Sequence, residues 1–329
     1  MATNAELPVV SQSGARAGTP SGVRPEVLAE FRKHTGSVLS GVFAGAAFDQ
    51  VALVPVAAAV DRTGRFAANF ADRGVRSGFS ALLAMWGDPA DRQAEAEWLK
   101  QRHRDVHGRG RGDYHDVRYS ALNPQTWIWV GVSGMFVALN TFTYCTGTVL
   151  RPAEKEAAYQ MLREGFSGLE LAARSGKLPP DLASAAEYYD TMVERELAAN
   201  PFLVEQFAGL TRLPLPTLGL PPLLRSALLP LWLLLRHLAG HVIQVCSAEV
   251  MHPGVRRMVG FELKRRHHVE FAAYVWLLQV AWKVLPDRLL LAPLAYNRLQ
   301  YEKLVRLHRK YALDSFSPPS GAAGGCPLS

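Results

Sequence analysis

The chain has 329 residues, of which 49% are hydrophobic and 20% charged. This composition is typical of a globular protein with a sizeable core and excludes a disordered chain. The 36 Lys and Arg against 29 Asp and Glu give a net charge of +7. However, the arginines are spread along the sequence, and it has neither a zinc-finger spacing nor an aromatic RNA-binding motif, so we expect no nucleic-acid partner.

Residues 1–24 are predicted to form a flexible leader, and the Pro-, Gly- and Ala-rich residues 315–329 a flexible tail. Residues 25–314 are predicted to form one helical domain. The leader has no basic region followed by an apolar core, and the three cysteines have no CxxC spacing. Both features favour a cytoplasmic protein.

Proline, glycine and acidic capping residues predict the ends of the helices in chain order. The first helix begins near Pro25, and the next, over 38–54, is rich in small residues. A helix over 74–87 precedes one over 88–108, which starts at an Asp-Pro cap and ends at a glycine. Further helices are predicted over 152–176, 179–201 and, as the last major one, 262–286. Alternating β-branched runs are few, so the predicted fold class is all-α.

Two apolar stretches are tested against the length of a membrane span. Residues 119–150 contain no charge and are long enough to span, but their many Asn, Gln, Ser and Thr side chains favour a helix surrounded by protein. The stretch between Arg225 and Arg236 is too short to span. It is predicted either to lie in the core or to contact an apolar substrate or a membrane surface, which makes a peripheral membrane contact an open alternative.

His103 and His107 are four residues apart, a spacing that predicts one face of a helix. A zinc site is one interpretation, with His115 or a nearby aspartate as third ligand. Arg104 stands where metallohydrolases carry their glutamate base, which weakens that interpretation. The alternatives are a basic helix end that interacts with the helix dipole and a single histidine that ligates haem iron beside cationic groups.

Two further groups of residues accompany these histidines. Arg73, Arg76 and Ser77 share one helical face by their spacing, although each alone is typical of a solvated surface. Gly131 and Gly134 form a small-residue stripe on a later helix. Such a stripe is explained equally well by close helix–helix packing and by room for a flat ring.

The sequence resembles the MpaB-type oxygenases, whose fold is shared with the latex-clearing proteins (rubber oxygenases). Arg73-x-x-Arg76-Ser77 is similar to the family's Arg-x-x-Lys/Arg-Thr, and residues 103–108, HRDVHG, are similar to its His-x-x-Val-x-Gly. Residues 119–130, 178–192 and 285–298 resemble other family segments in the same order. The similarity extends from about Leu39 to about Arg298.

The resemblance implies an all-helical protein with a haem b (iron) cofactor. His103 matches the family's proximal haem ligand, while Arg73 and Ser77 match its distal catalytic side, with Arg76 at the position that can be Lys. His107 is expected beside a haem propionate. An arginine opposite the ligand would stabilise negative charge that develops on dioxygen or peroxide.

The implied function is a haem b-dependent oxygenase or oxidoreductase that oxidises a small apolar or partly apolar molecule with dioxygen or peroxide. The alternatives are a non-catalytic helical protein that binds haem or lipid and, more weakly, a metal-dependent hydrolase. The chain departs from the family at Val54 and Gly131, where many members have histidine. A second catalytic or ligating histidine is therefore not supported at these two positions.

Overall fold

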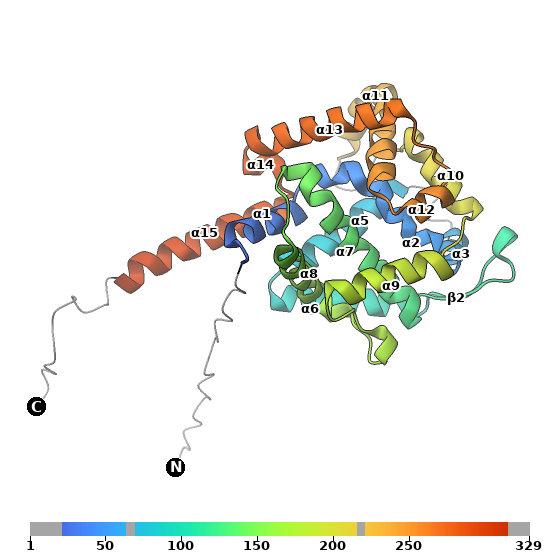
Figure 1. Cartoon of the computed structure of the whole chain (residues 1–329), viewed down its shortest axis with the longest axis horizontal. Helices are drawn as coiled ribbons and strands as arrows, with labels where there is room; N and C mark the ends of the chain where they lie inside the picture. Colours follow the sequence, from blue (N-terminus) through green and yellow to red (C-terminus); the bar gives the residue numbers. More distant parts are fainter. Residues whose placement is uncertain (1–21, 64–69, 216–220, 315–329) are drawn as a thin grey trace, which may run out of the picture.

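The structure, a computed structural model, describes residues 22–63, 70–215 and 221–314. The predicted tail and all but the last three residues of the predicted leader lie outside the described residues. Helices dominate the described part of the chain, with one sheet of two short strands, so the all-α prediction is confirmed (Figure 1).

The elements before the sheet largely begin and end where the capping residues predict. They are α1 (Pro25–Thr35), the 3₁₀ helix η1 (Val38–Phe48), α2 (Asp49–Ala52), α3 (Val54–Thr63), α5 (Phe70–Trp86) and α6 (Pro89–His103). The N-cap of α6 is Asp88, whose side chain accepts a hydrogen bond from the backbone NH of Asp91. The segment predicted as one small-residue helix is mostly 3₁₀ and packs closely against the later helix α11 (Pro222–Val250), where a Cβ on Gly45 would lie 2.8 Å from Ser247 Oγ.

The remaining elements complete the helical domain. They are β1 (His107–Arg109), η2 (Gly112–Tyr114), β2 (Arg118–Ser120), α7 (Pro124–Thr146), α8 (Pro152–Phe166), η3 (Ser167–Leu169), η4 (Arg174–Gly176), α9 (Leu182–Arg195), α10 (Pro201–Gly209), η5 (Leu210–Arg212), α11 (Pro222–Val250), α12 (Pro253–Met258), α13 (Arg265–Val284), α14 (Asp287–Leu290) and α15 (Pro293–Asp314). The prediction that the helix over 262–286 is the last major one is wrong, because α15 follows it and projects from the body (Figure 1).

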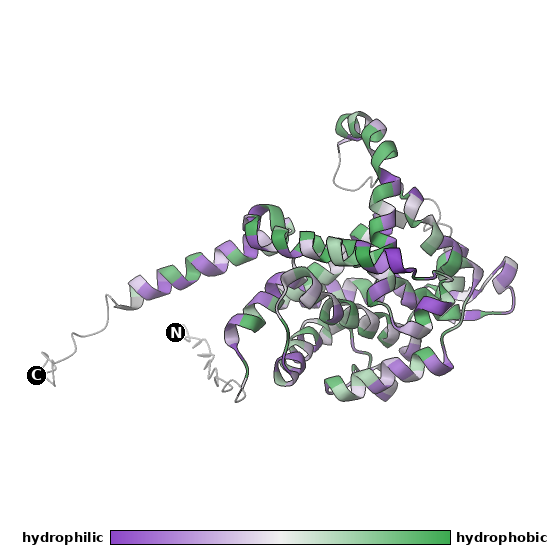
Figure 2. Ribbon diagram, turned by 45° about the horizontal axis from the view of Figure 1, so that its top comes forward, coloured by the Kyte–Doolittle hydropathy of each residue, from purple (hydrophilic) through white to green (hydrophobic). Residues whose placement is uncertain are grey.

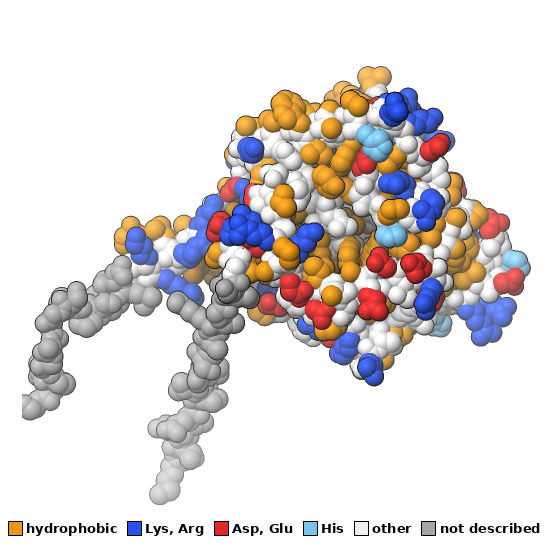
Figure 3. Space-filling view, viewed as in Figure 1, with side chains coloured by type: hydrophobic (Ala, Val, Ile, Leu, Met, Phe, Trp, Pro, Cys, Tyr) orange, Lys and Arg blue, Asp and Glu red, His pale blue; other side chains and the backbone are white. Residues whose placement is uncertain are grey.

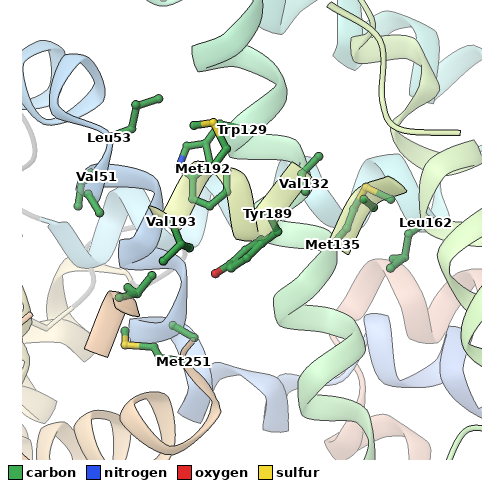
Figure 4. Packing of buried hydrophobic residues seen from close by; sticks show 14 of the residues in the cluster. Val51, Leu53, Trp129, Val132, Met135, Leu162, Tyr189, Met192, Val193 and Met251 are labelled. Carbon is green, nitrogen blue, oxygen red and sulfur yellow. The ribbon is translucent and has the colours of Figure 1, made fainter. Parts of the chain in front are cut away.

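Helix α7 runs through the core, as its uncharged but polar sequence predicts. Its Trp129, Val132 and Met135 are fully buried, and Tyr189 and Met192 of α9 pack beside them (Figure 4). By length and composition alone, α7 and α11 are the two described helices that would be able to cross a membrane. The burial of α7 explains its apolar sequence without a membrane.

A buried carboxylate joins three distant segments of this core. Asp49 accepts hydrogen bonds from Ser133 Oγ at 2.5 Å and from the hydroxyl of Tyr189 at 2.6 Å. Burial raises the pKa of Asp49 to about 6, although both hydrogen bonds act in the opposite direction. The network therefore links α2, α7 and α9 through a group that ionises near neutral pH.

The N-terminal part of α11 has a different environment. Residues 222–239 are exposed or half-buried, whereas residues 244–248 are buried. Figure 2 shows this apolar part standing away from the body. Of the two alternatives for the stretch between Arg225 and Arg236, the core interpretation is therefore wrong.

Candidate functional site

Helices α5 and α6 form an antiparallel pair that brings the two predicted motifs to one end. Ser80 Oγ of α5 donates a hydrogen bond to Glu95 Oε1 of α6 at 2.5 Å, which fixes the alignment of the helices. Arg73 precedes Ser80 by about two turns, and His103 follows Glu95 by about two turns. The predicted distal and proximal residues consequently lie at the same end of the helix pair.

His103 is the last residue of α6, and its ring is tied to its own helix. Its Nδ1 atom lies 2.8 Å from the carbonyl oxygen of Leu99. A carbonyl oxygen only accepts hydrogen bonds, so Nδ1 must carry the proton in the neutral ring. The lone pair then belongs to Nε2, the arrangement of a histidine that ligates a metal through Nε2.

The ring of Trp127, at the start of α7, packs against the His103 ring. The two rings meet edge to face with centroids 5.3 Å apart. The indole Nε1 donates a hydrogen bond to the carbonyl oxygen of Leu169 at 2.6 Å, which fixes the ring. Sequence reasoning missed Trp127, because nothing in the spacing of the motifs connects it to His103.

The α5 face that carries the distal residues is open. Arg73, Arg76 and Ser77 are exposed, and a Cβ on Gly74 or Gly78 would meet no atom within 4 Å. Among the described residues, no side chain covers this half of the helix closely enough to exclude a ligand.

Phe79 lies on the same open half of α5 and is 54% exposed. Phe79 follows Arg76 by three residues, so neighbouring positions on this helix combine apolar and cationic surface. This combination suits a ligand with a large apolar body and an anionic edge.

The two glycines of α7 are not needed for close helix packing. A Cβ on Gly134 would meet nothing within 4 Å, and one on Gly131 would meet only Leu178 Cδ2, at an ordinary 3.7 Å. Of the two interpretations of the small-residue stripe, the structure favours open space beside the helix. Both glycines are half-buried.

His107 does not share a helix face with His103, and that part of the prediction is wrong. Helix α6 ends at His103, and His107 is an exposed residue of β1 that pairs with Ser120 of β2. Gly108 adopts a φ of +153°, which is incompatible with a continuing helix and favours glycine. The chain therefore turns into a strand pair where the sequence suggested another turn of helix.

The zinc interpretation finds no support in the described part of the chain. No group of three or more His, Cys, Asp and Glu residues able to hold a metal ion is found there. His115, the suggested third ligand, is exposed and pairs with its neighbour Asp116 at 2.8 Å. A haem iron needs only one axial histidine from the protein, so this finding does not bear against His103 as a haem ligand.

His237 and His241 are also four residues apart in the sequence, and the structure explains their positions. His241 Nε2 lies 2.7 Å from Glu270 Oε2 and so links α11 to α13, while His237 is exposed. This hydrogen bond assigns His241 to a helix interface.

Comparison with known families confirms the family resemblance. The model of the family described as "ER-bound oxygenase mpaB/B'/Rubber oxygenase, catalytic domain" matches residues 30–280. The matched range contains α5, α6 and α7 in full. No curated protein sequence and no solved structure is significantly similar to the chain.

Proposed function

The chain belongs to the family of the ER-bound oxygenase mpaB/B' and rubber oxygenase catalytic domain, and on this basis we propose that it is a haem b-dependent oxygenase. It would use dioxygen or peroxide to oxidise a small, apolar or partly apolar molecule. Oxygenase chemistry is the property of the family, whereas the haem, the oxidant and the substrate class are our proposals for this chain.

The environment of His103 carries the proposal. Its Nδ1–H is held by the Leu99 carbonyl and its ring rests on Trp127, so the orientation of Nε2 is set by two helices. A neutral imidazole held in this way is a good axial ligand for haem iron, and the hydrogen bond at Nδ1 increases its basicity. Haem, when bound, would supply the redox-active iron and the coordination position for the oxidant.

The residues of α5 would act on the side where the oxidant binds. Arg73 would supply a guanidinium to stabilise negative charge that develops on the oxidant, and the Ser77 hydroxyl would donate a hydrogen bond to it or hold a water there. Arg76 would add a second positive charge on this part of α5, able to pair with an anionic group of a ligand.

The open space beside α7 would leave room for a flat ring. The backbone at Gly134 is open to a ligand, and Gly131 has room for a close approach. The exposed ring of Phe79 adds apolar surface at the open half of α5. These features favour an apolar substrate over a strongly polar one, because burial of apolar surface would supply most of its binding energy.

The proposal is tested by the visible spectrum of the purified full-length protein, loaded with added haemin and freed of excess. We expect a Soret band in the wild type that is lost or strongly shifted in His103→Ala. His107→Ala is the matched control, because this histidine lies four residues away but on an exposed strand, and it should retain the band. A wild-type protein that binds no haemin would overturn the haem proposal, and an unchanged band in His103→Ala would overturn the ligand assignment.

A further inference from the structure

Large apolar side chains are exposed mainly in the C-terminal third of the chain. Figure 3 shows hydrophobic side chains gathered along the edge of the molecule where Figure 1 draws α11, α13 and α14. Helices α11 and α13 pack against one another through the C-terminal part of α11, where His241 meets Glu270, so the exposed stretch of α11 begins where this helix leaves α13. We call this surface the α11–α13 face; its large exposed side chains are Leu223, Leu224, Leu229, Leu231, Leu233, Leu234, Leu235, Leu238, Val269, Trp276, Leu277, Val280 and Val284.

Helix α13 has an apolar outer surface with basic ends. Between His268 and Lys283 every exposed position is apolar, and Trp276 in the middle is 63% exposed. Arg265 and Arg266 are exposed at the start of the helix and Lys283 near its end. The acidic residue within this range, Glu270, is half-buried and paired with His241.

Helix α11 repeats this arrangement. Residues 226–235 are ten uncharged residues, bounded by Arg225 on one side and by Arg236 on the other. Most of their side chains are exposed, and Leu234 is 79% exposed. Ten helical residues measure about 15 Å, roughly half of the hydrocarbon thickness of a bilayer.

The positive charge of the protein is concentrated in the same region. Residues 221–314 contain 14 Lys and Arg against 6 Asp and Glu, a net charge of +8, whereas the rest of the chain has 22 against 23. The exposed apolar face therefore lies in a basic part of the sequence. Basic residues around an apolar surface match a membrane interface that exposes anionic headgroups above hydrocarbon.

We propose that the α11–α13 face binds the surface of an anionic membrane and enters one leaflet without crossing it. The apolar residues 226–235 lie between Arg225 and Arg236 and are too few to cross a bilayer. Both arginines can therefore reach the headgroups of one leaflet only when the helix lies roughly in the membrane plane. A second copy of the chain suits this face less well as a partner. A symmetric dimer would bring the basic residues at the ends of the two faces together, and their like charges would repel.

Binding of the full-length protein to sedimented vesicles tests the proposal independently of haem and turnover. We expect it to pellet with phosphatidylcholine–phosphatidylserine vesicles and much less with phosphatidylcholine alone, and added salt should weaken binding. The double variant Trp276→Ser/Leu277→Ser should weaken binding at least about tenfold, since it removes two large apolar side chains. Arg265→Gln should weaken binding to the anionic vesicles about fivefold.

The matched control is Trp98→Ser/Val130→Ser, which removes two exposed apolar side chains from α6 and from the first half of α7 and should leave binding unchanged. All of these positions are exposed, so the variants are expected to fold, which circular dichroism checks. Two results would overturn the proposal: no pelleting with anionic vesicles, or a dimer in light scattering that Trp276→Ser/Leu277→Ser converts to a monomer. The second result would assign the face to a protein interface.

Discussion

The Nδ1 atom of His103 and the carbonyl oxygen of Leu99 are 2.8 Å apart, one helical turn from each other in α6. The last turn of the helix thus supplies both the imidazole and the acceptor that determines its tautomer. Because the acceptor belongs to the backbone, no side-chain substitution at Leu99 removes it directly. The orientation of the ring is more easily altered from α7, through Trp127.

Trp127→Phe is expected to lower the free energy of unfolding by about 1 kcal/mol, because it removes the hydrogen bond to the Leu169 carbonyl. It should also shift the Soret band of the haem-loaded protein, since His103 loses a fixed neighbour. Urea denaturation and visible spectroscopy measure the two effects. Trp232→Phe is the matched control: this half-buried indole donates to the Leu213 carbonyl in another part of the protein. An equal spectral shift in both variants would contradict the role of Trp127.

Arg73→Ala should reduce oxidative turnover by on the order of 100-fold while haem loading stays unchanged, because the variant removes positive charge from the oxidant's side only. Ser77→Ala should have a smaller effect of the same kind. The rate of peroxide-dependent oxidation of a small chromogenic donor provides the measurement. Arg102→Ala, an arginine that stacks on Trp98 in α6, is the control and should retain its rate. Wild-type turnover in Arg73→Ala would disprove the distal assignment.

Gly134→Ala should stabilise the haem-free protein by about 1 kcal/mol, since alanine is the better helix former and its Cβ meets no atom within 4 Å. Gly134→Leu should fill the neighbouring space and reduce haem loading without unfolding the protein. Thermal unfolding and the Soret absorbance report the two quantities. Gly45→Ala is the contrasting variant, because its Cβ would press on Ser247 and Leu210, and it should destabilise the protein. Destabilisation by Gly134→Ala would show that the space is not open.

Asp49 makes the stability depend on pH. Its pKa is raised by burial to about 6, above the ordinary 3.8 of an unfolded chain. The stability that this group contributes is therefore complete below about pH 4 and is lost as the pH rises through about 6. Asp49→Asn should lack this decline, so the difference in free energy of unfolding between wild type and variant should change between pH 4 and 7.

Urea denaturation at several pH values measures this difference. The comparison with Asp49→Asn is needed because the buried His34 has the opposite effect. Desolvation lowers the pKa of His34 to about 4, and its contribution is lost as the pH falls from about 6.5 to about 4. A difference between wild type and Asp49→Asn that is constant over pH 4–7 would contradict the assignment.

Much of the fold was predictable because the helix ends are encoded locally. Pro25 and the Asp88-Pro89 pair start α1 and α6 where predicted, and Gly87 ends α5. The end of α6 was not predictable, because a residue pattern compatible with helix continues to Gly108 and only the pairing of β1 with β2 interrupts it.

The site was predictable only in part. The motif containing Arg73 and Ser77 and the motif beginning at His103 come from a family resemblance, and their meeting at one end of a helix pair follows from the antiparallel arrangement. Trp127 and the network around Asp49 depend on contacts between distant segments, which no local pattern records. The tautomer of His103 likewise required the position of a backbone carbonyl.

At Gly240, α11 passes from exposed to buried surroundings, and its backbone lies directly against η5 there. A Cβ at this position would collide with the Leu210 carbonyl oxygen and with Thr211. The eighteen residues before it form an arm of about 27 Å. Rotating such an arm by about 10° would move its tip by about 5 Å. The absence of a side chain at Gly240 therefore sets the angle between the exposed part of α11, with its leucines, and the rest of the protein. Gly240→Ala would change the direction of this part of α11 without replacing any of its exposed leucines.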